Sequence, residues 1–100
     1  MTPLPQITTV SSASMRLTWP EPPCISFEQE LQVRMLPDGW TAARRIDLSQ
    51  HANRNYKLRT QSYTLTDLVP QKSYELRLVW NDSAGGVVAV DTPAATCVIM

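Results

Sequence analysis

Few residues of this chain could carry out covalent, acid–base or metal chemistry. Its single histidine, His51, stands in a polar stretch with no histidine or cysteine at metal-ligand spacing. Glu28 and Glu30 are two residues apart, so on a strand their side chains share one face. Paired carboxylates act as acid and base only where a cleft raises the pKa of one of them, and we expect these two to be solvated or paired with Arg77. The sequence therefore predicts no enzyme, no metal site, no cofactor and no small-molecule substrate.

Two short motifs could instead be modified, and they require opposite cellular compartments. Asn81-Asp82-Ser83 is an N-glycosylation sequon, which acts only in a secreted chain. Cys97-Val98-Ile99-Met100 fits the farnesylation signal, which acts only at a true carboxyl terminus in the cytosol. No basic stretch precedes Cys97, so a lipid there would anchor the chain weakly.

The charge balance excludes one class of partner. The 100 residues contain nine basic and nine acidic side chains, for a formal net charge of zero. Nucleic acids and anionic membranes are recognised through a basic excess, so neither is an expected partner. No apolar run approaches the roughly 20 residues of a membrane-spanning helix. We therefore expect membrane contact only through a parent transmembrane chain or a lipidated tail.

The strongest structural pattern lies in residues 68–80, where a proline turn leads into strict alternation. From position 74 to 80, apolar side chains alternate with Glu75 and Arg77, as in a half-buried strand. Residues 15–19 alternate in the same way. The expected strands cover about residues 6–10, 15–19, 30–35, 43–48, 63–65, 74–80 and 87–92. The polar stretch 49–62 is expected to be a loop, with a weak strand near Tyr56 to Arg59.

The pattern Leu68-x-Pro70-x-x-x-Tyr74, together with Trp19 and a glycine-bearing loop after residue 80, resembles fibronectin type III domains. The resemblance implies an all-β, immunoglobulin-like, seven-stranded antiparallel β-sandwich over residues 1–92, followed by a tail over 93–100. It also implies a structural core that includes Trp19, Leu68, Pro70 and Tyr74. The hydroxyl of Tyr74 would hydrogen-bond to upstream backbone as a tyrosine corner.

A narrower resemblance is to the fibronectin-type stalk domains of class I cytokine receptors. It rests on the run 29–34, on Trp40 and on Tyr74-Glu75-Leu76-Arg77-Leu78, whereas the Trp-Ser-x-Trp-Ser signature of that family is absent. In those receptors, arginines on an exposed sheet face stack against tryptophans. The resemblance implies a module of a receptor on the extracellular side of the plasma membrane, with protein partners.

Two surfaces are candidates for partner contact, and a pure spacer role is the alternative. The first is the loop end of the sandwich, with Pro22, Pro23, Ile25 and Ser83, because a rigid scaffold positions loops there. The second is an outer sheet face with Arg34, Trp40 and Arg77, whose cations can stack on the indole. An alternative hypothesis for the function is a small intracellular adaptor that farnesyl-Cys97 anchors to the cytoplasmic face of membranes.

Overall fold

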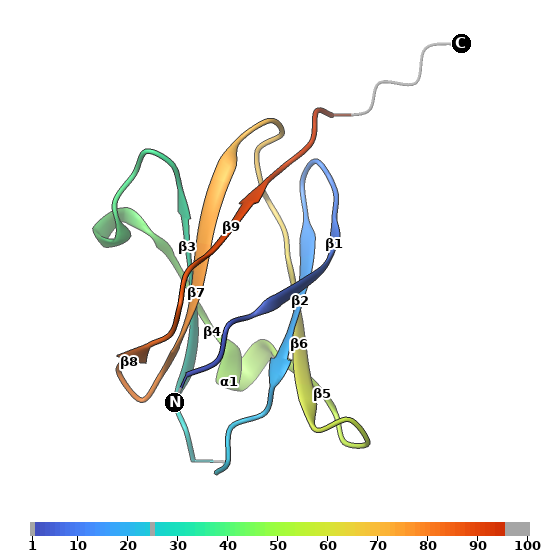
Figure 1. Ribbon diagram of the computed structural model, residues 1–100, viewed down its shortest axis with the longest axis vertical. Coiled ribbons are helices and arrows are strands. Elements are labelled where there is room, and N and C mark those ends of the chain that lie inside the picture. Colours follow the sequence, from blue (N-terminus) through green and yellow to red (C-terminus); the bar gives the residue numbers. More distant parts are fainter. Residues whose placement is uncertain (1, 25, 96–100) are drawn as a thin grey trace.

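The computed structural model describes residues 2–24 and 26–95, which form two antiparallel β-sheets packed face to face (Figure 1). The first sheet has the strand order β1-β2-β6-β5, and the second has the order β4-β3-β7-β8, with β9 also paired to β7. The first sheet consists of β1 (Gln6–Val10), β2 (Met15–Pro20), β5 (Asn53–Asn55) and β6 (Thr60–Leu65). The second consists of β3 (Gln29–Met35), β4 (Arg44–Asp47), β7 (Ser73–Trp80), β8 (Ser83–Ala84) and β9 (Val88–Asp91). The predicted β-sandwich is confirmed, with β5 and β8 as short strands beyond the expected seven.

The core consists of the inward residues of the alternating strands. In β7, every second side chain from position 74 to position 80 is buried, and the side chains between them are half-buried on the outer face. Strand β2 buries Met15, Leu17 and Trp19 in the same way. Burial of one such apolar side chain stabilises the fold by about 1.5–3 kcal/mol. The period of two in the sequence is therefore what brings the two sheets together.

Trp19 is buried near the end of β2, 2% exposed, and its indole links the two sheets. Its Nε1–H donates to Gln29 Oε1 in β3 at 3.2 Å and to Gln61 Oε1 in β6 at 3.1 Å. Both glutamines are buried. A buried polar group without a hydrogen-bond partner is costly. The indole N–H avoids this cost because it has one glutamine acceptor in each sheet.

The turn before β7 is held by the hydroxyl of Tyr74. The Val69 N–H donates to Tyr74 Oη at 2.7 Å, five residues upstream, as in a tyrosine corner. Leu68 is buried and Pro70 half-buried. Thr92, the residue after β9, donates from its hydroxyl to the Val69 carbonyl at 2.6 Å. The end of β9 is therefore tied to the same corner, which the sequence did not predict.

The stretch 49–62 differs from its prediction. It begins with a short helix, α1 (Leu48–His51), for which the Asp47 side chain accepts the Ser49 N–H and Leu48 provides a buried anchor. A strand follows at β5, and residues 56–59, predicted as a weak strand, form the turn between β5 and β6. With four residues, α1 is far too short to cross a bilayer, and no other helix of the described residues could cross one.

Candidate functional site: an arginine–tryptophan stack on the outer sheet face

Two arginines on the outer face of the second sheet stack on one indole. Arg34 extends from β3 and Arg77 from β7, and Trp40 lies in the 3₁₀ turn η1 (Trp40–Ala42) between β3 and β4. The guanidinium carbons of Arg34 and Arg77 are 4.6 Å and 4.1 Å from the centroid of the Trp40 ring. Each such contact contributes about 0.5–1 kcal/mol at an exposed site. The structure thus brings all three predicted residues of this face together, with Trp40 in a turn before β4 and not in the strand itself.

Side chains that the sequence did not single out hold the two guanidiniums. Arg34 forms an ion pair with Glu75, its cross-strand neighbour in β7, and donates from Nη1 to the Asp38 carbonyl at 3.4 Å. Arg77 donates from Nε to Gln32 Oε1 at 2.8 Å. Of the two alternatives expected for Glu28 and Glu30, pairing with Arg77 is not observed, because Gln32 is the residue opposite Arg77 in the register. Glu28 is exposed to solvent, as in the other alternative.

The network continues along the sheet and leaves little freedom to its members. Gln32 donates in turn to Glu30 Oε2 at 2.7 Å, and Glu30 lies 4.0 Å from Arg45 Nε. Gln32 is only 5% exposed even though it belongs to the outer face, because the side chains above cover it. A rigid surface of arginine and tryptophan loses little conformational entropy when it meets a partner. The alternation of β3 and β7 places Gln32 and Glu75 at outward positions, on the same face as the two arginines. The sequence could therefore have identified them as neighbours of Arg34 and Arg77.

The loop end of the sandwich offers less free surface than expected. Pro22 is buried, so its predicted role as a contact residue is corrected, whereas Pro23 is exposed. Ser83 is exposed, but its carbonyl accepts a hydrogen bond from Thr2 Oγ1 at 2.8 Å. Ile25 lies outside the described residues, as does Cys97.

The amino-terminal segment also covers the loop between β8 and β9. A Cβ on Gly85 would lie 3.0 Å from the backbone oxygens of Thr2 and Pro3, and a Cβ on Gly86 would lie 2.6 Å from Leu4 Cδ2. The two glycines therefore allow a close approach of the backbone of residues 2–4. This segment occupies the position where the sequence placed part of a partner surface.

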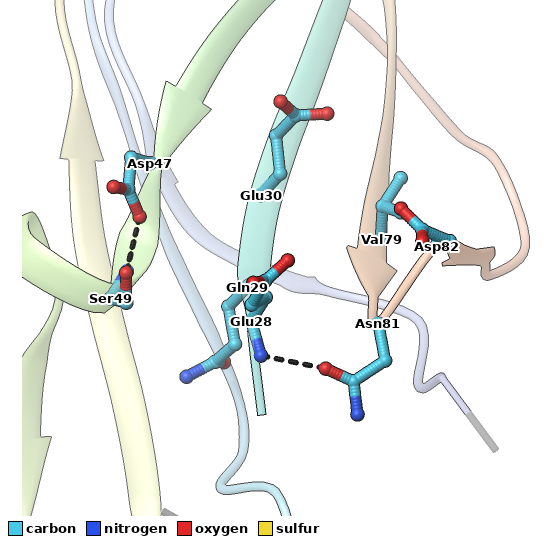
Figure 2. Close-up of a pocket in the computed structure, with 8 residues that line it drawn as sticks. All are labelled: Glu28, Gln29, Glu30, Asp47, Ser49, Val79, Asn81 and Asp82. Carbon is cyan, nitrogen blue, oxygen red and sulfur yellow. Dashed lines mark hydrogen bonds between the residues drawn. The ribbon is translucent and has the colours of Figure 1, made fainter. Parts of the chain in front are cut away.

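A small hollow lies near this end, on the outer face of the second sheet, as Figure 2 shows. Its volume is about 360 Å³, and eight residues line it: Glu28, Gln29, Glu30, Asp47, Ser49, Val79, Asn81 and Asp82. Asn81 and Asp82 form the two-residue turn between β7 and β8, with φ angles of 47° and 66°. Such positive φ values are typical of the type I′ hairpin turn and favour asparagine and aspartate. The sequon thus lies in a tight turn, with Asn81 Oδ1 accepting the Glu28 N–H at 2.8 Å.

Hydrogen bonds shift the pKa of two exposed groups at this end. The Ser49 hydroxyl and, to a smaller extent, the Ser49 N–H lower the pKa of the Asp47 carboxyl below its ordinary value of 3.8. The Ser26 side chain, 3.0 Å from Cys24 Sγ, lowers the pKa of that thiol.

His51 is exposed at the end of α1. Within residues 2–24 and 26–95, no group of three histidine, cysteine or acidic side chains is arranged to hold a metal ion.

Comparison with known proteins identifies the fold. No protein-family model and no curated protein matches the chain in sequence. The FN1–FN3 domains of chicken CNTN1 match with a TM-score of 0.69 and 20% identity over 93% of this chain, which spans only 31% of that one. The sensor domain of the anti-sigma factor RsgI4 of Pseudobacteroides cellulosolvens matches with a TM-score of 0.67 and 13% identity, covering 100% of this chain and 97% of that one.

A third solved structure, the FN3 domain of human collagen XX, has a TM-score of 0.57 and 18% identity, covering 86% of this chain and 85% of that one. At these identities the likeness concerns architecture. It agrees with the tyrosine corner and with the strand order of the two sheets. The chain has the fibronectin type III fold.

Proposed function

We propose that the chain is a non-enzymatic protein-interaction and spacer module of a cell-surface receptor, of the kind found as stalk domains in class I cytokine receptors. The observation that carries this proposal is the stack of Arg34 and Arg77 on Trp40. The resemblance to those receptors implies arginines stacked on tryptophan at an exposed sheet face, and here both arginines come from the two central strands of the second sheet.

The stacked face has the chemistry of a protein contact. Tryptophan and arginine are the side chains most enriched among residues that dominate binding energy at interfaces. Arg34 and Glu75 are about a quarter exposed, so a partner can reach them while the network keeps them in place. A partner of this face would present acidic or carbonyl groups around an apolar contact for the indole.

The extracellular location is supported by the accessibility of the sequon. Asn81 is exposed, and its hydrogen bond to Glu28 uses Oδ1, whereas a glycan would be attached to Nδ2. In Figure 2 the Nδ2 atom of Asn81 points away from that bond. Glycosylation therefore does not require the turn to open.

The location is tested by labelling the protein in the cells that express it. An antibody against the folded chain should stain intact cells, and Asn81→Gln should remove a glycan mass from the surface protein. Staining that appears only after permeabilisation, together with a farnesyl adduct on Cys97, would contradict the proposal and favour the membrane-tethered adaptor.

The contact face is tested by cross-linking on intact cells. We expect the wild-type protein to form a discrete cross-linked complex that Trp40→Ala removes. Arg16→Ala, on the other sheet, is the matched control and should leave the complex unchanged, since Arg16 makes a single 3.4 Å bond to Ser62. A complex that survives Trp40→Ala would show that this face is not the contact.

A further inference from the structure

The hairpin between β5 and β6 presents the most exposed large apolar side chains of the described residues. Tyr56 is 78% exposed and Leu58 is 71% exposed. They lie in the turn of residues 56–59, which we call the hairpin tip. Scattered apolar residues on a surface are ordinary, but these two are close in sequence at the end of a projecting hairpin (Figure 1). The tip therefore presents an apolar contact that the domain itself leaves uncovered.

The tip is held in one shape. Asn55 Oδ1 accepts the backbone N–H groups of both Lys57 and Leu58, each at 3.1 Å. The carbonyl of Arg59 accepts the Glu21 N–H at 3.0 Å, which ties the tip to the end of β2. A side chain presented on a fixed turn loses less entropy on binding than one on a free loop.

The tip is also basic. Arg54, Lys57 and Arg59 lie within three residues of Tyr56 in sequence, and the Arg54 guanidinium lies 5.6 Å from the centroid of the Tyr56 ring. Arg54 forms an ion pair with Glu21 at 3.5 Å. Lys57 and Arg59 form no ion pair with any residue of 2–24 or 26–95. The tip thus carries two cations without a counter-charge.

The complementary surface is on the same molecule. The hollow of Figure 2 lies toward the same end of the sandwich as the tip, on the outer face of the other sheet. Four of its eight lining residues are acidic: Glu28, Glu30, Asp47 and Asp82. Their one basic neighbour among the ion pairs of the described residues is Arg45, 4.0 Å from Glu30. A space of 360 Å³ equals the volume of about a dozen waters, which is room for one tyrosine side chain.

We propose that the hairpin tip of one copy docks into the acidic hollow of a second copy, with Lys57 and Arg59 facing Glu28 and Glu30. Complementary charges steer such an encounter and fix its register. With a net charge of zero, two copies do not repel each other as whole molecules. Arg34, Trp40 and Arg77 do not line the hollow, and the two surfaces share only Glu30, which accepts a hydrogen bond from Gln32. Self-association and the cross-link through Trp40 are therefore measured separately, and either can fail without the other.

A glycan on Asn81 would cover the hollow, because Asn81 lines it. The contact therefore belongs to protein that is not glycosylated there. Glycosylation of Asn81 would therefore compete with self-association. Protein produced in bacteria lacks the glycan and is the right material for the first measurement.

The test is sedimentation equilibrium of the bacterially produced chain from micromolar to millimolar concentration. We expect the weight-average mass to rise with concentration at low salt and the rise to diminish at high salt, since the pairs are exposed. The tip variant Lys57→Glu with Arg59→Asp, and the hollow variant Glu28→Lys, should each weaken association at least about tenfold, or roughly 1.4 kcal/mol. Glu30 is left unchanged because it accepts a hydrogen bond from Gln32 in the network beneath Trp40. Aspartate is chosen at position 59 because the φ of 54° disfavours most other residues.

An equimolar mixture of the tip and hollow variants decides between this contact and a general loss of folding. The reversed charges are again complementary in the mixture, so we expect association between the two variants that neither shows alone. Lys72→Glu is the control for a charge reversal elsewhere on the surface and should associate as the wild type does.

Three results would overturn the proposal. The first is a wild-type chain that stays monomeric at millimolar concentration, and the second is association that both charge-reversed variants retain. The third is binding to phosphatidylserine vesicles that the tip variant abolishes and the hollow variant preserves, in a chain that does not self-associate. That third result would assign the tip to a membrane surface.

Discussion

Replacing Tyr74 with phenylalanine measures how much the corner before β7 contributes to stability. The change removes only the hydroxyl that accepts the Val69 N–H at 2.7 Å. The ring is 5% exposed and keeps its place, so the loss concerns one hydrogen bond. A net hydrogen bond contributes about 1 kcal/mol, and a donor left buried without a partner costs about 1–3 kcal/mol.

The exposure of Val69 places the expected cost near the lower end of that range. Val69 is 43% exposed, so water can replace part of the lost contact at its N–H. We expect Tyr74→Phe to lower the free energy of unfolding by about 1–1.5 kcal/mol. For a domain of this size, 1 kcal/mol corresponds to a decrease in Tm of roughly 4–8 °C.

The assay is urea unfolding followed by tryptophan fluorescence, with Tyr63→Phe as the matched control. Tyr63 is half-buried in β6, and its hydroxyl makes no hydrogen bond within residues 2–24 and 26–95. The midpoint should fall for Tyr74→Phe at an unchanged slope and stay within error for Tyr63→Phe. Equal midpoints for the two variants would refute the reasoning, because the hydroxyl of Tyr74 would then contribute nothing specific.

Three further predictions concern the surface. Trp40→Ala removes the indole on which two guanidiniums stack, and it should cost about 1–2 kcal/mol in urea unfolding. This is well below the roughly 3–5 kcal/mol expected for Trp19→Ala; equal costs would contradict the assignment of one indole to the face and the other to the core. Gly85→Ala, whose new Cβ meets backbone oxygens at 3.0 Å, should loosen the amino-terminal segment and lower the NMR order parameters of the Thr2 and Leu4 amides. Unchanged order parameters would show that the segment is not held there. In an NMR titration the pKa of the Asp47 carboxyl should lie below 3.8, and Ser49→Ala should raise it. Because folding lowers this pKa, the ionised carboxylate stabilises the fold at pH values above the pKa of the unfolded chain. That stabilisation is lost as the pH falls through the pKa of the folded protein.

The sequence predicted the elements whose cause is local. Strict alternation from Tyr74 to Trp80 requires a half-buried strand, and it is buried as expected. The proline before that strand marked the corner correctly. In both cases neighbouring residues of one segment carry the signal, so no knowledge of the partner strand was needed.

The features that the sequence did not predict depend on residues far apart in the chain. Pro22 is buried, and Gln32 accepts a hydrogen bond from Arg77 only because β3 and β7 pair in one register. Thr2 donates a hydrogen bond to Ser83 in β8, 81 residues away in the chain. Short polar elements such as α1 have almost no periodicity of their own. Their existence is decided by one cap and one buried anchor.

The bond between Trp19 and its two glutamines gives the protein an internal reporter. The indole proton is shared between Gln29 and Gln61, one in each layer, so both bonds must open before solvent deuterium can replace it. Its exchange rate should therefore follow the complete opening of the sandwich. The indole proton of Trp40, in a half-buried turn on the outside, should exchange far sooner. A series of NMR spectra recorded after transfer to deuterated water would then separate local fluctuations at the surface from the rare global unfolding of the domain.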